Sequence, residues 1–317
     1  MISSGDIDPV FKIKSYARSI GFDLIGIAPA RPLTEHQDKL KNWISGNMNA
    51  DMDFIARDFQ KRTDPSLILE GVKSVIVTGI NYFPSDKQGG EGIPFIAKYA
   101  YGKDYHRVVG EMLNDLLAFI ISIEPYAKGK VCVDSSPILE KAWAREAGLG
   151  WIGKNSILLN DKIGSFIFLG EILLDIELGH DKPFSEDFCG SCNLCLKACP
   201  TNAINRNKTI DANKCISWLT VENKNDIPEI CKPGMNGRIF GCDICQDICP
   251  FNKDLIPHNN PEFRLSENLK KLSRVDYQNM SFEYFNEIFE NSPIKRLGYK
   301  KFMRNINSVL SDSPMTD

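Results

Sequence analysis

The sequence predicts an α/β (α+β) domain over residues 1–180, a cysteine-rich domain over 181–260 and a short helical segment over 261–317. Two observations support this division. Helix and strand patterns alternate along the first 180 residues, as in a layered α/β domain. Nine of the ten cysteines then fall between Cys189 and Cys249, most of them at a regular spacing. With 317 residues, 43% of them hydrophobic, the chain has room for two domains and a large core.

The first domain begins with apolar residues at helical spacing over 7–20, and Gly21 is a typical C-cap. A strand follows over 22–28. The β-branched run KSVIVTGINY at 73–82 suits a central strand. By the same patterns, further helices are expected at 32–45, 51–59, 105–123 and 138–147, and further strands at 130–133 and 165–174.

The cysteine-rich domain opens with Cys189-x2-Cys192-x2-Cys195-x3-Cys199-Pro200. This is the spacing of bacterial ferredoxins, in which three thiolates hold one four-iron cluster and the fourth crosses to a second cluster. The pattern therefore predicts a bacterial-ferredoxin-like domain with two clusters.

The second half of the motif, Cys242-x2-Cys245-x3-Cys249, lacks its first cysteine, because Ile239 stands there. Cys215 is the available replacement. When the ferredoxin crossover is applied to both halves, each cluster takes one ligand from the opposite half. The predicted ligands are Cys189, Cys192, Cys195 and Cys249 for cluster one, and Cys242, Cys245, Cys199 and Cys215 for cluster two.

Two other uses of these cysteines compete with iron–sulfur ligation. Paired CxxC units also make zinc sites, but zinc rarely takes three cysteines within seven residues followed by Cys-Pro. Disulfides belong to oxidising compartments, and no secretory signal is visible. The two remaining cysteines, Cys132 and Cys231, are expected to be a buried small side chain and a spare thiol.

Asp134 follows a short apolar strand and precedes Ser135, Ser136 and Pro137. It would lie at the carboxyl end of that strand, where α/β sheets open onto ligands. An equally local interpretation is a helix N-cap, since Asp, Ser and Pro often begin helices. The sequence around Asp134 leaves both open. The nearby GLGWIGKN reads as a flexible loop and matches neither common phosphate-binding pattern.

Composition and charge restrict the remaining classes. No apolar run reaches the roughly 18 residues of a membrane span, and the N-terminus has no signal pattern, so we expect a cytoplasmic protein without membrane contact. The net charge of -3 argues against a generally basic nucleic-acid binder. A local basic face stays compatible with that charge.

Several long blocks resemble epoxyqueuosine reductase, the cobalamin-dependent oxidoreductase family that completes queuosine in tRNA. The similar blocks lie between about residues 5 and 305. They are YGKDYH, VDSSPILEKAWAREAGLGWIGKN, CGSCNLCLKACPTNAI, KCISWLT and FGCDICQDICP. The family's ligand scheme for its two [4Fe-4S] clusters is the one given above, including Cys215.

The resemblance implies a base-off cob(II)alamin between the α/β domain and the cluster domain, with no histidine on cobalt. The usual Asp-x-His-x-x-Gly signature is missed, because the glycine after Asp104-Tyr105-His106 comes one residue late, at Gly110. His106 is then expected to be a structural or pocket residue. By position, the implied cofactor contacts are Arg57, Ala97, Asp134, Asn155, Ser156, Leu169 and Ser217.

The implied reaction opens and deoxygenates an epoxide, which takes two electrons and two protons. Electrons from a low-potential donor would pass through the clusters to give cob(I)alamin, which attacks the ring. Asp134 matches the family's proton donor. For that role Asp134 must carry a proton near neutral pH, and we expect burial against an apolar corrin to raise its pKa enough for this.

The implied partner is a tRNA that carries epoxyqueuosine in its anticodon loop, bound by a monomer. Positions on the family's tRNA side are Lys141, Glu222, Asn223 and Lys224. Two basic groups are candidates for phosphate contact or for ordinary solvated surface. They are Lys295, Arg296, Lys300, Lys301 and Arg304, and Arg206, Lys208, Lys214 and Lys224. Many family members continue into C-terminal helical repeats, whereas this sequence stops at Asp317.

Two alternatives of other classes remain at the level of sequence. A corrinoid enzyme of the reductive dehalogenase type also combines cobalamin with two clusters, but it normally carries an export signal. A non-enzymatic electron carrier needs the clusters alone, and the large α/β domain is then unexplained.

Overall fold

A four-stranded antiparallel sheet organises the first half of the chain. Its strands lie in the order β1 (Leu24–Pro29), β2 (Ser74–Asn81), β7 (Ile167–Leu174) and β4 (Gly129–Cys132). The two central strands are buried along nearly their whole length, as expected of strands covered on both faces. The computed structural model describes residues 8–90 and 92–310.

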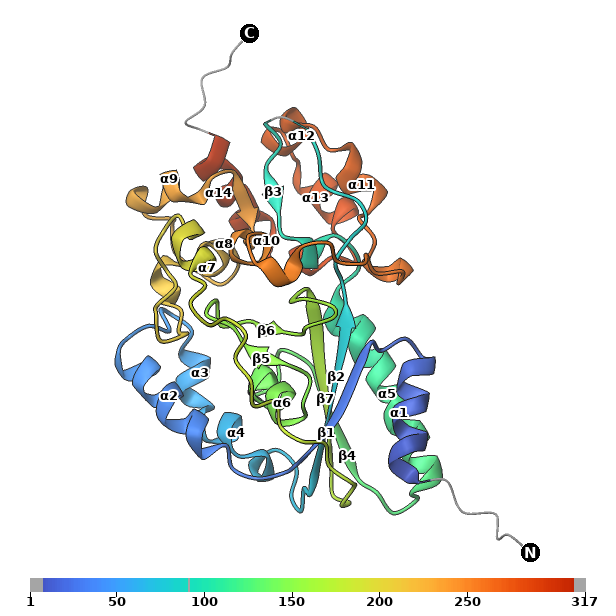
Figure 1. Cartoon of the computed structure of the whole chain (residues 1–317). Coiled ribbons are helices and arrows are strands. Elements are labelled where there is room, and N and C mark those ends of the chain that lie inside the picture. The colour runs from blue at the N-terminus through green and yellow to red at the C-terminus, as the bar shows by residue number, and fades with distance from the viewer. Residues whose placement is uncertain (1–7, 91, 311–317) are drawn as a thin grey trace, which may run out of the picture.

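Helices cover both faces of this sheet (Figure 1). On one face α1 (Pro9–Ser19) and α5 (Tyr105–Ile123) pack together over an apolar core. On the other face α6 (Glu140–Glu146) buries Ala142, Trp143 and Ala144 against the strands. Beside it lie α2 (Thr34–Ser45), α3 (Asp53–Arg57) and α4 (Phe59–Thr63).

A tight hairpin follows α6, formed by β5 (Trp151–Ile152) and β6 (Leu158–Leu159). Gly150 directly precedes β5 and has φ of 156°. A Cβ at that position would lie 2.0 Å from the Leu159 carbonyl oxygen. The segment expected to be a flexible loop is therefore closely packed. Its glycine is required by a backbone contact.

The second body contains the cysteines and the C-terminal helices, above the sheet in Figure 1. A segment of the first half completes it, because β3 (Phe95–Ile96) leaves the sheet region and pairs in parallel with β8 (Arg238–Phe240). Ile96, Ala100 and Tyr101 share a core with the last helices. The helices of this body are α7 (Leu194–Ala198), α8 (Ile216–Val221), α9 (Lys232–Met235), α10 (Ile244–Asp247), α11 (Glu267–Lys271), α12 (Arg274–Gln278), α13 (Phe282–Ile288) and α14 (Tyr299–Leu310).

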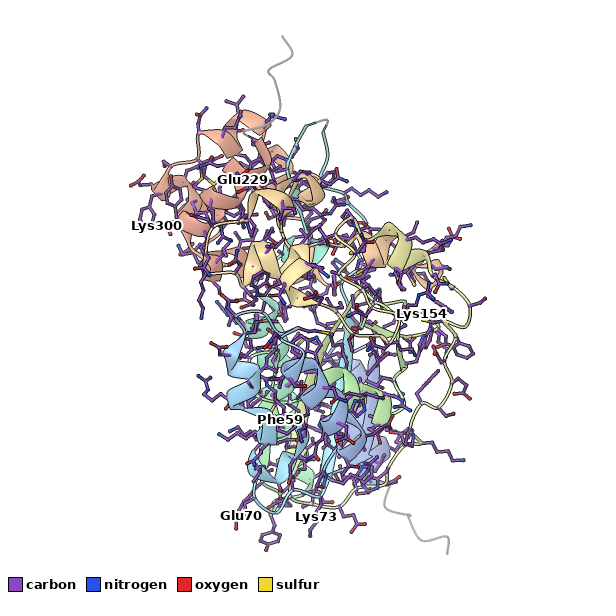
Figure 2. All side chains as sticks on the ribbon, turned by 90° about the vertical axis from the view of Figure 1, so that its left-hand side faces the viewer. Phe59, Glu70, Lys73, Lys154, Glu229 and Lys300 are labelled. Carbon is purple, nitrogen blue, oxygen red and sulfur yellow. The ribbon has the colours of Figure 1, made fainter. Side chains whose placement is uncertain are left out.

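Figure 2 shows the two bodies from the side. Glu70 and Lys73 lie at the far end of the sheet, Glu229 and Lys300 lie on the second body, and Lys154 lies at the level of the junction. Within residues 8–90 and 92–310, no helix has the length and apolar character needed to cross a membrane.

The sheet differs from the expected arrangement in one respect that matters for the site. All its pairings are antiparallel, so the rule that ligands bind at the carboxyl ends of parallel strands does not apply to Asp134. The helix N-cap interpretation is also wrong, because α6 begins at Glu140 with Leu139 as its N-cap. Asp134 instead adopts φ of 43° in the turn after β4, a conformation that Asp and Asn tolerate better than most residues.

The tight hairpin generates a stability prediction. Gly150→Ala should lower the free energy of unfolding by more than about 1 kcal/mol, because it strains both backbone and packing. Gly110→Ala is the matched control. Gly110 lies in α5, and a Cβ there would meet no heavy atom of another part of the protein within 4 Å. Alanine at this position should therefore raise the free energy of unfolding by about 0.5–1 kcal/mol. Thermal and urea unfolding measure both. Equal effects of the two substitutions would contradict the packing of the hairpin.

Candidate cluster centres and active site

Eight thiols form two groups of four in the second body. Burial and the nearby Cys189, Cys249 and Cys192 thiolates raise the pKa of Cys195, and burial with the Cys189 and Cys192 thiolates raises that of Cys249. These four side chains therefore lie close together. The spacing and soft donor set fit one all-cysteine four-iron cluster.

The second group is assembled in the same way. Burial and the thiolates of Cys242 and Cys215 raise the pKa of Cys245. Burial and the Cys199 thiolate likewise raise the pKa of Cys215. All ten cysteines are free thiols. Cys132 is fully buried in the apolar core, as expected.

The displaced ligand has a structural cause. Ile239, at the position of the missing cysteine, is fully buried in β8, and its carbonyl accepts a hydrogen bond from Asn305 Nδ2 at 2.9 Å. A side chain there points into the core of the C-terminal helices. Cys215, at the N-cap of α8, takes its place beside Cys242 and Cys245.

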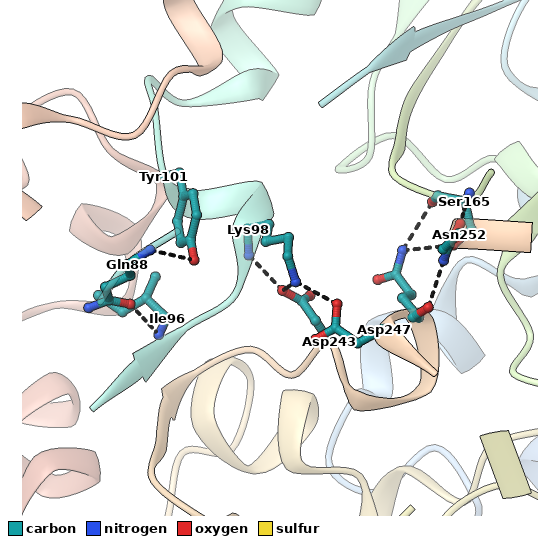
Figure 3. A network of polar contacts seen from close by, with 9 residues as sticks. Gln88, Ile96, Lys98, Tyr101, Ser165, Asp243, Asp247 and Asn252 are labelled. Carbon is teal, nitrogen blue, oxygen red and sulfur yellow. Dashed lines mark hydrogen bonds and ion pairs between the residues drawn. The ribbon is translucent and has the colours of Figure 1, made fainter. Parts of the chain in front are cut away.

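Helix α10, which lies between the last cysteines, is clamped on two sides (Figure 3). On one side Lys98 donates from its backbone to Asp243 Oδ2 at 2.8 Å and from Nζ to Asp247 Oδ1 at 2.6 Å. On the other side Gln246 Nε2 and Asn252 Nδ2 donate to Ser165 Oγ at 3.1 and 2.8 Å. Gln246 and Asn252 are buried. The cluster loops are thus tied to the sheet by satisfied polar contacts.

The two thiol groups differ in their access to solvent. Around the first group the exposed apolar residues are Phe188, Leu194 and Ile248, which expose 51%, 42% and 43% of their surface. Lys154 Nζ supports this loop, donating to the carbonyls of Gly190 and Cys192 at 2.7 and 2.8 Å. The second group is flanked by buried residues such as Ile216 and Phe240. The first group is therefore the outer one.

A cavity of about 540 Å³ opens between the two bodies. It combines aromatic, acidic and basic side chains. Its lining residues are Met52, Tyr99, Tyr105, His106, Asp134, Ser217, Trp218, Val221, Glu222, Lys224, Phe240, Pro293, Arg296, Leu297 and Lys301. Ser217 is only two residues from Cys215, so the inner thiol group adjoins this cavity.

An acid–base chain stands in the wall of the cavity. His106 Nε2 contacts Asp134 Oδ2 at 2.7 Å, and Nδ1 contacts Asp104 Oδ1 at 2.6 Å. Burial opposes the charge of His106, but these two carboxylates raise its pKa to about 9. The imidazolium is therefore present at neutral pH.

The protein's own groups hold the pKa of Asp134 below its ordinary value, whereas the expected rise depends on burial against a corrin. Burial does tend to raise its pKa, but the hydrogen bond and charge of His106, with a hydrogen bond from Tyr105, lower it. The proton of this pair resides on the imidazole. Tyr105 is fixed in turn by stacking on Phe168, with ring centroids 4.5 Å apart.

The cavity fits a flat macrocycle without a histidine ligand. Apolar and aromatic side chains on both bodies can pack against its faces. His106 is the one histidine among the lining residues, and both its ring nitrogens are engaged by carboxylates. It is therefore not available to a cobalt ion, in agreement with the base-off form that the resemblance implies.

The structure brings some predicted site residues together and leaves others apart. Asp134, Ser217, Glu222 and Lys224 line the cavity, whereas Asn223 is buried and shapes the turn between the last two. The other predicted contacts lie outside the lining. Arg57 and Lys141 are at the surface, Ala97 and Leu169 are buried, and Asn155 and Ser156 hydrogen-bond to the Cys245 and Lys208 carbonyls.

The basic groups also separate. Arg304 Nη1 and Nη2 donate to the carbonyls of Asn223 and Leu219 at 3.0 and 3.2 Å, which makes this arginine a structural tie. Lys208 and Lys214 pair with acidic side chains. Arg296 and Lys301 instead line the cavity. Sequence reasoning grouped all these residues by proximity in the chain and had no signal to distinguish them.

Comparisons with known proteins agree with this architecture. Residues 62–135 match the family model described as "Epoxyqueuosine reductase QueG, DUF1730", and residues 188–252 match that of a 4Fe-4S double cluster binding domain. The epoxyqueuosine reductase of Cyclobacterium marinum is 43% identical over 302 residues, which cover 95% of this chain and 96% of that protein. The chain belongs to the epoxyqueuosine reductase family.

Solved structures of the family superpose on the whole fold. An epoxyqueuosine reductase bound to an epoxyqueuosine-modified tRNA-Tyr stem loop has a TM-score of 0.89 at 31% identity, covering 95% of this chain and 80% of that one. The Bacillus subtilis enzyme, with a catalytic loop swung out of its active site, has a TM-score of 0.88 at 30% identity, covering 95% and 81%. The 4Fe-4S match supports iron–sulfur clusters over zinc sites, and the family is one of oxidoreductases rather than electron carriers.

The ligand assignment generates a second prediction. Reconstituted protein should bind about eight irons, and Cys215→Ala should retain about four, because cluster two loses a thiolate. Adding Ile239→Cys should not restore the second cluster, since position 239 lies in the core. Iron and sulfide analysis with electron paramagnetic resonance measures the loss. Cys231→Ala is the control and should keep both clusters. Eight irons in Cys215→Ala would remove Cys215 from the ligand set.

Proposed function

We propose that this chain reduces epoxyqueuosine to queuosine in the anticodon loop of tRNA, with the His106–Asp134 pair as its proton donor. One observation carries the proposal. A single cavity places this pair opposite Ser217 and Trp218, which directly follow the inner cluster ligand Cys215. Protons and electrons can therefore be supplied to one bound substrate. Since tRNA is the substrate, the site of action is the cytoplasm.

Cobalamin would be held in the cavity between the two bodies, by Ser217 and the aromatic lining. The resemblance also implies contacts from five residues that lie outside this lining, which are Arg57, Ala97, Asn155, Ser156 and Leu169. When bound, cobalamin supplies a strongly reducing, nucleophilic metal centre. The eight thiols would hold two four-iron clusters, which supply one-electron transfer.

The chain's own residues manage the protons. Opening of the epoxide develops negative charge on its oxygen, and a hydrogen-bonded acid lowers that barrier. His106 holds the proton at neutral pH, and Asp134, half exposed to the cavity, lies between it and the substrate. Asp134 can thus pass a proton from the imidazolium to the oxygen. Asp104 keeps the ring oriented through Nδ1.

The tRNA would approach the cavity from the side of Glu222, Lys224, Arg296 and Lys301, because these residues surround its mouth. Asn223 shapes the turn between Glu222 and Lys224, and Lys141 on α6 would add a further contact. A low-potential donor protein would dock on the outer thiol group, where apolar side chains are exposed.

The working unit is a monomer with parts 1–180, 181–260 and 261–317, in which residues 93–101 contribute to the second core.

The third prediction tests the acid pair. Asp134→Asn should lower turnover by roughly 10²- to 10⁴-fold, the usual contribution of general acid catalysis, because an amide cannot relay the proton. The fold should survive, since asparagine accepts the left-handed backbone at this position. Anaerobic turnover on epoxyqueuosine tRNA, followed by nucleoside mass analysis, gives the rate. Asp115→Asn, exposed on α5, is the matched control. Normal turnover in an Asp134→Asn variant loaded with clusters and cobalamin would show that Asp134 is not the proton donor.

The fourth prediction concerns tRNA binding. Replacing Lys224, Arg296 and Lys301 by alanine should weaken binding and lower the slope of log affinity against log salt by about 2–3, at roughly 0.7–0.9 for each phosphate contact. Filter binding over a salt series measures this slope. Lys73, Lys128 and Lys130 are the control triple, since they are exposed at the opposite end of the sheet. Equal slopes for the two triples would move the binding face away from the cavity.

A further inference from the structure

A buried carboxyl group behind Asp134 has no part in the mechanism above. Glu171 lies in the middle of β7 with no exposed surface. The strand register places it beside Val77 on β2 and Cys132 on β4, both of which belong to the apolar core under α6. Neither carboxyl oxygen has a hydrogen-bond partner among the described residues. Since an unpaired carboxylate is very costly in such surroundings, Glu171 is held as a neutral acid.

Glu140 connects this acid to the active site. It is the first residue of α6, and its Oε1 accepts a hydrogen bond from the Asp134 backbone N at 2.6 Å. Burial and the charge of Asp134 raise the pKa of Glu140 to about 7. Burial and the charge of Glu140 also raise the pKa of Glu171 well above its ordinary value. Two carboxyls that interact in a poorly solvated site do not both ionise, so the pair retains a proton.

The charged groups around the pair come from several elements. Arg62 on α4, His106 on α5 and Lys141 on α6 are cations that act on Glu140. The Cys132 thiol on β4 is close to Glu171, but burial raises its pKa to about 11 and keeps it neutral. These cations favour the ionised form of Glu140, and no cation among the described residues acts on Glu171 in the same way. Glu171 is therefore the carboxyl that keeps its proton at rest, and Glu140 is the carboxyl that exchanges protons with Asp134.

We propose that Glu140 and Glu171 form a proton store that reprotonates Asp134 within each turnover. The reaction consumes two protons, one when the C–O bond opens and one when the resulting hydroxyl leaves as water. The His106–Asp134 pair supplies the first. Glu140, whose carboxyl lies against the Asp134 backbone N, then gives a proton to the Asp134 carboxylate. Glu171, unpaired at rest, replaces that proton once its side chain turns toward Glu140. The step moves protons alone, and solvent refills the store through the exposed Asp134 after product release.

The inference rests on the proposed role of Asp134, and its test separates the two. Glu171→Gln keeps size and polarity but cannot give up a proton, and Glu171→Leu suits the apolar core. Glu146→Gln is the matched control, because this buried carboxylate lies on the same α6 and pairs with Arg31. All variants are examined as full chains with both clusters reconstituted.

The first measurement is infrared spectroscopy at neutral pH, before cobalamin is added. The carbonyl band of a protonated, buried carboxylic acid should be present in the parent protein and in Glu146→Gln. It should be clearly diminished in Glu171→Gln and in Glu171→Leu, with only the contribution of Glu140 remaining. The leucine variant should be at least as heat-stable as the parent, because it removes an unpaired polar group. An undiminished band in both Glu171 variants would overturn the proposal.

The second measurement is single-turnover reduction of epoxyqueuosine tRNA by cobalamin-loaded protein across pH. Both Glu171 variants should be slower by on the order of 10²-fold, with a larger solvent deuterium effect and a steeper loss above neutral pH. Parent rates and an unchanged pH profile in these variants, with Asp134→Asn inactive, would reject the proton store but leave Asp134 as the proton donor. Parent rates in Asp134→Asn as well would reject the proposed donor along with it.

Discussion

The polar clamp on α10 is the constraint on which the rest of the site depends. This short helix lies between cysteines of both predicted clusters, and by itself it is too short to be stable. Its position comes from Lys98 on one side and from Ser165, just before β7, on the other. Both partners belong to the part of the chain that precedes the cysteines. The distance between the cluster loops and the sheet therefore follows from these contacts.

The active site uses charge in a complementary way. Asp134 is kept ionised by a histidine, while Glu140 and Glu171 behind it are kept from ionising together by burial. With Asp104, four acidic groups thus lie at the cavity wall or behind it without accumulating four charges. This gradation of acidity arises from position alone, since the side chains are chemically almost identical. The positive φ of Asp134 directs its carboxyl away from the strand and toward His106.

Local features were predictable from the sequence, and long-range ones were not. The pattern at 105–123 predicted α5 with its observed ends, and the cysteine spacing predicted two sets of four thiols. The antiparallel order of the sheet, the pairing of β3 with β8 and the lowered pKa of Asp134 depend on contacts between residues far apart in the chain. Asp134 resembled a helix cap because the residues after it favour turns, and only tertiary packing moved the start of α6 to Glu140.

The β3–β8 pairing also determines when the protein can mature. The core behind Ile239 needs a strand from residues 95–96 and Asn305 from α14, which donates to the Ile239 carbonyl. These contacts join segments that are far apart in the chain, so they form late in folding. A ribosome will have released nearly the whole chain before the Cys242–Cys249 loop is held in place. We therefore expect the inner cluster site to be complete only after nearly the whole chain has been synthesised.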